Sequence, residues 1–234
     1  PPLGCGNGGL KWNDVKKLIE DKFSELKEKV DILIYEPFMS YKAIPKEAPN
    51  ITVAGLVLIQ IKLHLKKFGF LRLQKTGYFM NYFLGEEYFK FNKFHYGPYS
   101  HSIDIVARNI KEYQEHYGIV DSSETYNQVY RMICSQKTEA KLKKLLPAVE
   151  KASEYVNAIE TDKRLEGIAT VLYIVQKNNA KYDLQSITEQ FKNWSEDKEK
   201  RFSKEEIVEY INYLEDTNII LKNICGLYEE YKEI

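Results

Sequence analysis

The chain has 234 residues, of which 44 % are hydrophobic, and this is enough for one large domain with a core of its own. Its 34 basic residues balance 34 acidic ones, so overall charge predicts neither a polyanion-binding protein nor a membrane-surface protein. Three widely spaced cysteines and four histidines without metal-ligand spacing argue against a disulfide framework and a zinc site, and favour a reducing cytoplasm.

The N-terminal residues 1–36 predict a loop, a helix and a strand. Four glycines lie within the first nine residues, and apolar side chains then recur at helical spacing from Trp12 onward. A short β-rich run, DILIYE, follows and is ended by Pro37. A glycine loop that opens a helix and precedes a strand is half of an α/β unit, so we expect its neighbouring strands to lie upstream of Pro1.

Residues 37–50 contain three prolines and predict a linker. Beyond it the sequence predicts a helix over 51–68, capped by Asn50 and closed by Gly69, and then a second helix over 71–84. The first of these helices contains the most apolar run of the chain. That run is too short for a membrane span, which requires about 20 residues, and no signal peptide is visible.

The segment 86–100 alternates between two faces and predicts a strand or a hairpin, with Gly97 and Pro98 as the structural turn that begins the next helix. The rest of the chain has a helical pattern. Pro147 is expected to start a helix, and residues 164–176 form a helix apolar enough to be central. The last section predicts two helices joined by a charged loop. The expected fold class is mainly α (α+β).

Charge is unevenly distributed along the chain. Residues 51–120 hold nine Lys or Arg against five Asp or Glu, whereas residues 183–234 hold seven against thirteen. Because phosphate contacts supply much of the affinity for DNA, the acidic C-terminal helices argue against direct nucleic-acid binding. Their acidic cluster is either a solvated helix face or a surface that imitates a nucleic acid toward a basic partner. Its members are Glu196, Asp197, Glu199, Glu205, Glu206 and Glu209.

Two separate segments resemble one family. The opening PPLGCGNGGLKW, with the later DILIYEP, is similar to the last loop, helix and strand of the macrodomain found in DarG-type antitoxins and terminal ADP-ribose protein glycohydrolases. The segments LRLQKTGYFMNYF and FKFNKFHYGPYS resemble the C-terminal domain of DarG antitoxins, although a YGPY turn also occurs in Panacea-type antitoxins. The resemblance implies a macrodomain fragment over 1–36, a linker over 37–50, and a helical toxin-neutralising domain over 51–234.

The resemblance also implies a ligand for the opening loop. In the family this loop binds ADP-ribose, and glycine backbone N–H groups at a helix start can hold phosphates, although a tight turn would use the same residues. The family's catalytic lysine lies upstream of the loop, so we expect no catalytic residue and no cofactor in this chain. Asn7 or Gly8 stands where the glycohydrolase relative has an acid. The implied ligand loop comprises Gly4, Cys5, Gly6, Asn7, Gly8 and Gly9.

The function implied is that of a cytoplasmic antitoxin. It would bind a DarT-like ADP-ribosyltransferase toxin and block the toxin's single-stranded DNA site. One alternative is a hydrolase that removes ADP-ribose from thymidine in DNA, which requires a longer parent protein with a complete macrodomain. A second alternative is a nucleic-acid-binding regulator, against which the acidic C-terminal helices count.

The candidate toxin contacts lie around the YGPY segment. Gln74 is a polar residue among apolar ones, so it is also expected to be a buried anchor that requires a partner. Lys90 and Lys93, interleaved with phenylalanines, are typical of a platform for single strands or of a half-buried strand with solvated lysines. The whole candidate set is Gln74, Lys75, Lys90, Lys93, His95, Tyr96 and Tyr99.

Overall fold

The computed structural model describes residues 10–26, 30–32, 34, 47–177 and 182–231. The chain divides into two compact units, residues 1–47 and 48–234, and each is described by itself. The described residues form ten α-helices and two small antiparallel hairpins, which confirms the predicted mainly α class. None of the helices described has the length and apolar character that crossing a membrane would require.

The first unit contains helix α1 (Trp12–Lys22) and a 3-10 turn (Ser24–Leu26). Helix α1 forms where apolar spacing predicted it, but none of its residues is buried. The predicted strand over 31–36 is not formed at residues 31, 32 and 34, the three of its residues that the structure describes. A strand requires a hydrogen-bonded neighbour, and the described part of this unit provides none. The glycine loop, residues 4–9, lies outside the described residues.

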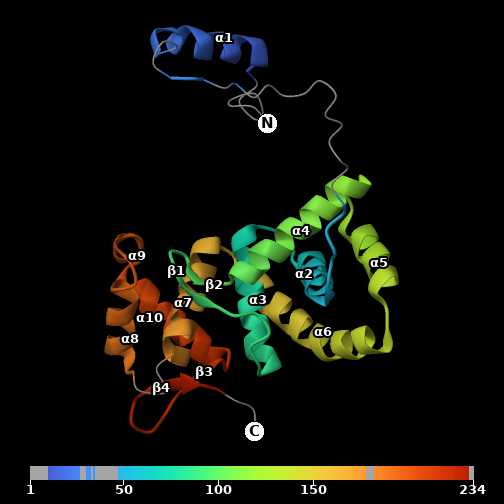
Figure 1. Ribbon diagram of the computed structural model, residues 1–234. Coiled ribbons are helices and arrows are strands. Elements are labelled where there is room, and N and C mark those ends of the chain that lie inside the picture. Colours follow the sequence, from blue (N-terminus) through green and yellow to red (C-terminus); the bar gives the residue numbers. More distant parts are fainter. Residues whose placement is uncertain (1–9, 27–29, 33, 35–46, 178–181, 232–234) are drawn as a thin grey trace. The chain divides into compact units, whose positions relative to one another are not determined.

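In the second unit, α3 and α7 occupy the centre (Figure 1). Helices α2, α4, α5 and α6 lie to one side of them, and α8, α9 and α10 lie to the other, beside the β1–β2 hairpin. The elements are α2 (Val53–His64), α3 (Phe70–Leu84), β1 (Asn92–Phe94), β2 (Gly97–Tyr99), α4 (His101–Tyr117), α5 (Ser122–Ile133), α6 (Gln136–Asn157), α7 (Asp162–Lys177), α8 (Leu184–Lys192), α9 (Glu196–Arg201), α10 (Lys204–Asp216), β3 (Ile220–Lys222) and β4 (Tyr228–Glu230).

Side-chain caps fix where five of these helices begin. In each, an Asp or Ser carboxylate or hydroxyl oxygen accepts a hydrogen bond from a backbone N–H of the first turn, which would otherwise lack a partner. At α10 the cap is reciprocal, because the Glu206 carboxylate also accepts from the Ser203 backbone N–H. The capping residues are Asp121, Ser135, Asp183, Ser195 and Ser203.

Helix α2 is shorter at both ends than predicted. It begins after Thr52 instead of Asn50, and it ends at His64 instead of Phe68. The C-terminal end is set by Asn157 of α6, whose side chain donates to the His64 carbonyl and accepts from the Lys66 N–H, each at 2.8 Å. Gly69 consequently precedes α3 and does not close α2.

Two further predictions about the C-terminal half were wrong, and one element was missed. Pro147 lies inside the continuous helix α6, which begins earlier at the Ser135 cap and keeps residues such as Leu145 and Val149 buried on both sides of the proline. The charged loop is largely the short helix α9. The hairpin of β3 and β4 was not predicted at all.

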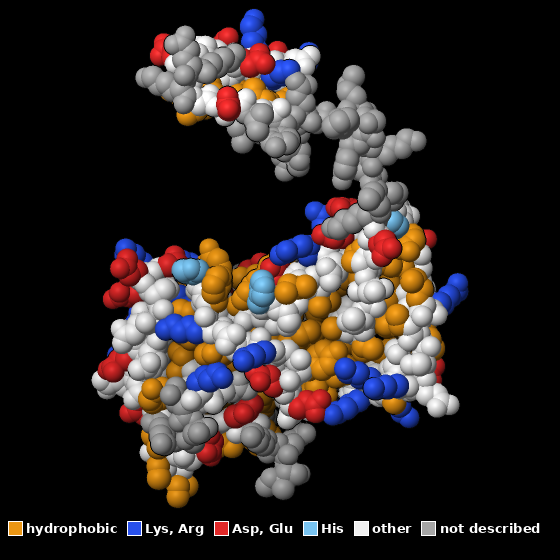
Figure 2. Space-filling model, in the orientation of Figure 1, with side chains coloured by type: hydrophobic (Ala, Val, Ile, Leu, Met, Phe, Trp, Pro, Cys, Tyr) orange, Lys and Arg blue, Asp and Glu red, His pale blue; other side chains and the backbone are white. Residues whose placement is uncertain are grey.

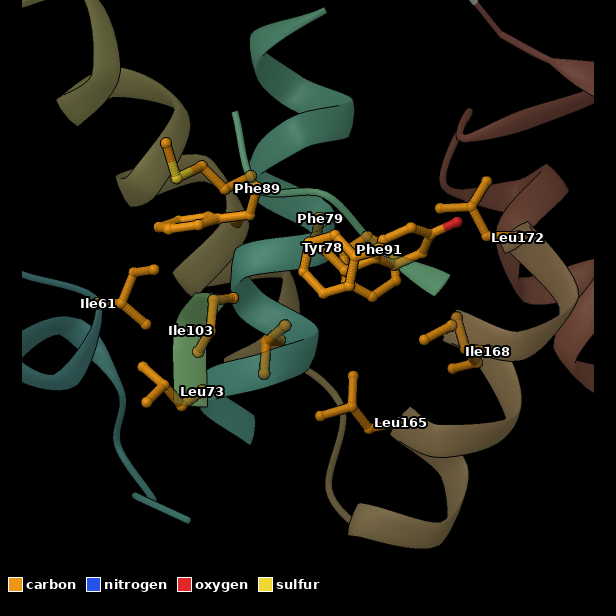
Figure 3. Packing of buried hydrophobic residues seen from close by; sticks show 14 of the residues in the cluster. Ile61, Leu73, Tyr78, Phe79, Phe89, Phe91, Ile103, Leu165, Ile168 and Leu172 are labelled. Atoms are coloured by element: carbon orange, nitrogen blue, oxygen red, sulfur yellow. The ribbon is translucent and has the colours of Figure 1, made fainter. Parts of the chain in front are cut away.

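The core joins the hairpin segment to both central helices. Figure 3 shows Tyr78 of α3 and Phe91 side by side, with Leu165, Ile168 and Leu172 of α7 nearby. The Tyr78 and Phe91 rings meet edge to face, with centroids 5.1 Å apart. Phe89 is also buried, so the alternation predicted before β1 is real: the phenylalanines of this face point inward and Lys90 is exposed.

A buried arginine fixes the corner between α6 and α7. The Arg72 guanidinium donates to the carbonyls of Val156, Ile159 and Glu160 and pairs with Asp162 at 2.8 Å. These carbonyls end α6 and the loop after it, where the helix itself offers no donors. The direction in which α7 leaves α6 therefore depends on a side chain of α3.

Candidate functional site

The predicted candidates lie on or beneath the β1–β2 hairpin. Its strands pair Asn92 with Tyr99 and Phe94 with Gly97, so the two-residue turn is His95 and Tyr96. Gly97 and Pro98 are therefore in β2, and their prediction as the turn was wrong.

The requirement for glycine at position 97 comes from packing and from the backbone. Gly97 has φ +90°, a conformation that L side chains rarely adopt. A Cβ atom there would also lie 2.6 Å from Thr170 Oγ1 of α7. The glycine thus allows β2 to approach the helix closely.

Gln74 and Lys75 of α3 hold the hairpin from below. The Gln74 amide donates to the Ser100 carbonyl at 3.0 Å and accepts from the Ser100 N–H at 2.9 Å, which supplies the partner that the sequence required. Lys75 Nζ donates to the carbonyls of Tyr96 at 2.5 Å and Pro98 at 2.9 Å. Both side chains are buried, at 2 % and 3 % exposure, so they position the hairpin and do not lie on its surface.

A second attachment comes from Trp194, two residues after the end of α8. Trp194 is buried, and its indole Nε1 donates to the Phe94 carbonyl at 2.8 Å. The Lys93 ammonium lies 4.7 Å from the centre of the Trp194 ring, within the range of a cation–π interaction. The turn is thus held on the β1 side by Trp194 and on the β2 side by Lys75.

A buried ionic cluster lies behind β2. Glu166 of α7 accepts from Lys198 at 2.5 Å and from Arg201 at 2.9 and 3.2 Å, and both Glu166 and Lys198 are almost fully buried. Burial lowers the pKa of Lys75 to about 7, and the nearby positive charge of Lys198 acts in the same direction. Burial also lowers the pKa of Lys198, while Glu166 opposes that shift.

The tip of the hairpin is exposed and aromatic. Phe94 and Tyr96 are 52 % and 57 % exposed. Phe94 stacks on Tyr99 with ring centroids 4.9 Å apart, and the Arg201 guanidinium lies 5.7 Å from the Tyr96 ring centre. In Figure 2 hydrophobic and histidine side chains reach the surface over the hairpin and α4. Of the predicted contacts, Lys90, Lys93, His95 and Tyr96 are exposed, and Tyr99 is half-buried.

Sequence reasoning missed the residues that support this tip. Thr170, Trp194, Lys198 and Arg201 come from parts of the chain far from the hairpin, and Lys198 looked like one of many solvated charges. One signal was present: Glu166 is an acid within an otherwise apolar helix, and a buried carboxylate requires a cationic partner.

The acidic cluster of the C-terminal helices is partly neutralised. Asp197 pairs with Arg201 at 2.8 Å, and Glu206 and Glu209 pair with Lys163 and Arg164 of α7, each at 2.5 Å. The other three acids, Glu196, Glu199 and Glu205, are exposed. This arrangement ties α10 to α7 and reduces the acidic surface that the sequence alone suggested.

These features define a class of protein: a helical unit that presents a rigidly held aromatic hairpin at its surface. Within the described part of the chain, no three His, Cys, Asp or Glu side chains gather in a way that could hold a metal ion. The arrangement suits recognition of a partner, since exposed aromatic and cationic side chains on a rigid support are the usual anchors of interfaces.

Comparison with known proteins adds a relationship to this class. A DNA ADP-ribosyl glycohydrolase of Thermus aquaticus is 30 % identical over 209 residues, which cover 83 % of this chain and 56 % of that protein. Proteins of the same name from Mycobacterium tuberculosis and Mycobacterium bovis are 30 % identical over 125 residues, covering 47 % of this chain and 35 % of theirs.

The chain is therefore similar to part of these DNA ADP-ribosyl glycohydrolases, and it spans about half the length of the first relative and about a third of the other two. No protein-family model matches it, and no solved structure matches it either.

Proposed function

We propose that residues 48–234 bind and inhibit a DNA ADP-ribosyltransferase of the DarT type, in a toxin–antitoxin pair, by blocking its single-stranded DNA site. The hairpin tip carries this proposal. It exposes Phe94, His95 and Tyr96 on a backbone fixed by Lys75 and Trp194, so little conformational freedom is lost when a partner binds. The relatives support it, because their name links the chain to the chemistry of ADP-ribose on DNA.

The test measures transfer of ADP-ribose to thymidine in a single-stranded oligonucleotide by a DarT-type enzyme. The full chain should stop the transfer at stoichiometric amounts. A double variant, Phe94→Ala with Tyr96→Ala, should weaken inhibition at least tenfold. Aromatic side chains that become buried at the centre of an interface typically contribute about 2 kcal/mol or more each to binding.

A matched control variant removes the same number of exposed apolar side chains at another place on the surface. Tyr117 and Met132 are exposed and lie away from the hairpin, so Tyr117→Ala with Met132→Ala should inhibit like the wild type. Full inhibition by the hairpin variant would show that the hairpin tip does not bind the transferase. No inhibition by the wild-type chain of a cognate, active transferase would overturn the function itself.

A second candidate function, removal of ADP-ribose from DNA, is favoured by the name of the relatives. It would depend on residues 4–9, which lie outside the described residues, and on a complete macrodomain. The direct measurement is release of ADP-ribose from a modified oligonucleotide by the chain as given. We expect none, and release would make the protein an enzyme in its present form.

A further inference from the structure

Three lysines of the second unit rest on aromatic rings along one connected surface. The ammonium groups of Lys93, Lys177 and Lys141 lie 4.7, 5.4 and 5.3 Å from the ring centres of Trp194, Tyr173 and Tyr88. These lysines come from β1, α7 and α6, so the fold assembles a pattern that no segment of the sequence contains.

The three pairs are linked through a hollow in the surface. Tyr173 meets Trp194 edge to face at 5.5 Å, which connects the first pair to the second. Tyr173 and Lys177 also line a cavity of about 760 Å³, whose wall includes Lys151 and Glu86. On the far side Glu86 pairs with Lys144 at 2.7 Å, one turn of α6 after Lys141.

The surface carries a positive excess. Its five lysines, the three above with Lys144 and Lys151, are all exposed. The acids at the cavity are Glu86, Glu87 and Glu230, and two of them are engaged, Glu86 with Lys144 and Glu230 with the Gln176 amide at 2.7 Å. Figure 2 shows Lys and Arg side chains, with Asp and Glu side chains among them, on the face that carries α7 and α6.

We propose that this surface, the three lysine–ring pairs with Lys144 and Lys151, is a binding track for single-stranded nucleic acid. In the free protein each ring is covered by an ammonium group. A single strand offers a phosphate to each ammonium and a base to each half-buried tyrosine ring, so both groups gain a partner together. The cavity, whose lining includes Tyr78, Tyr82, Phe83, Phe91 and Tyr173, has room for an unstacked base.

The inference differs from the expectation drawn from the sequence. The acidic balance of residues 183–234 argued against nucleic-acid binding, but all five lysines lie outside that segment. Charges that decide binding are those that share a surface, and four of the five lysines lie on α6 and α7, whereas the acidic cluster lies on α9 and α10.

The test uses the full chain and a fluorescent oligothymidine of about 16 nucleotides, the upper site size of a typical single-strand module, with binding followed by anisotropy as salt is varied. The track variant carries Lys141→Glu, Lys151→Glu and Lys177→Glu. We expect at least tenfold weaker binding at low salt, and a slope of log affinity against log salt that is smaller by about 2, since each phosphate contact on a single strand contributes about 0.7.

The control variant carries Lys111→Glu, Lys200→Glu and Lys204→Glu, which changes net charge equally on exposed lysines of α4, α9 and α10, helices that hold none of the track lysines. It should bind within twofold of the wild type. Equal loss in both variants, or no binding by the wild type at low salt, would overturn the track.

One more variant separates the contribution of base stacking to affinity from that of charge. Tyr88→Leu removes a ring and no charge, so it should lower affinity and leave the salt slope unchanged. Polyphosphate that competes as well as the oligonucleotide, at equal charge, would instead show a general polyanion surface and overturn the assignment to nucleic acid. No transferase is present in these assays, so their outcome is independent of the inhibition proposed above.

Discussion

Lys75 holds the β2 side of the hairpin through two hydrogen bonds. It reaches from α3 to two carbonyls on either side of Gly97, and it does so beside a cluster that already contains Lys198 and Arg201. Burial, and after it the nearby charge of Lys198, lowers the pKa of Lys75, and a neutral amine still has enough N–H groups to donate to both carbonyls.

Replacing Lys75 with Met should destabilise the protein although the substituted side chain is apolar and similar in length. The Tyr96 and Pro98 carbonyls would lose their donor, and an unpaired buried polar group costs about 1–3 kcal/mol. We expect the free energy of unfolding in urea to fall by about 2 kcal/mol. Lys143→Met, at an exposed site of α6, is the control and should change it by less than about 0.5 kcal/mol.

The same residue predicts how stability depends on pH. The folded-state pKa of Lys75, about 7, lies below its unfolded value of 10.5, so between these values the unfolded chain holds a proton that the folded chain lacks. The free energy of unfolding should therefore rise with pH across this window. Lys198, whose pKa is also lowered, adds in the same direction.

Urea unfolding between about pH 7 and about pH 9 checks this, because unfolded tyrosines titrate only near pH 10. Buried tyrosines such as Tyr78, whose pKa is raised, would reverse the trend above that range. Lys75→Met should have a smaller slope than the wild type. Identical slopes would show that Lys75 keeps its proton in the folded protein.

At the scale of the element, the hairpin depends on a glycine whose role is packing against a helix. Gly97→Ala would force a side chain into a positive φ and against Thr170. Strain of this kind costs about 1–3 kcal/mol, and we expect a loss of that size in thermal or chemical unfolding. Gly69→Ala is the matched control, because a Cβ there meets nothing within 4 Å and φ is not positive. Equal effects at both positions would contradict the packing argument.

The hairpin also shows which structural features could be predicted from the sequence. The alternation before β1 correctly predicted which phenylalanines are buried. The prediction that Gln74 has a hydrogen-bond partner is also confirmed, because a buried amide requires one. The turn was misplaced because Gly–Pro is a frequent turn signal, and only tertiary contact with α7 reveals its other use. Pairing of Glu166 with Lys198 depends on how α7 and α9 meet, which local patterns do not encode.

At the scale of the molecule, the second unit has a core of its own. The cluster of buried hydrophobic residues runs from Ile51 to Tyr228, entirely within residues 48–234. We expect the fragment 48–234 to unfold cooperatively in calorimetry, with the Tm that this unit has in the whole chain. A fragment that starts at residue 66 removes α2 and its buried face, so it should show no cooperative transition. A lower Tm for 48–234 would mean that residues 1–47 stabilise the unit.

The supports of the hairpin lie far apart in the chain, on α3, on α7, at Trp194 between α8 and α9, and on α9. During synthesis the hairpin therefore leaves the ribosome long before Trp194 and Arg201 exist to hold it. A nascent or prematurely terminated chain would contain the whole hairpin sequence and still lack its recognition geometry. The hairpin acquires its full set of supports only when nearly the last helix has been made, so the binding proposed for it would report that the unit has been completed.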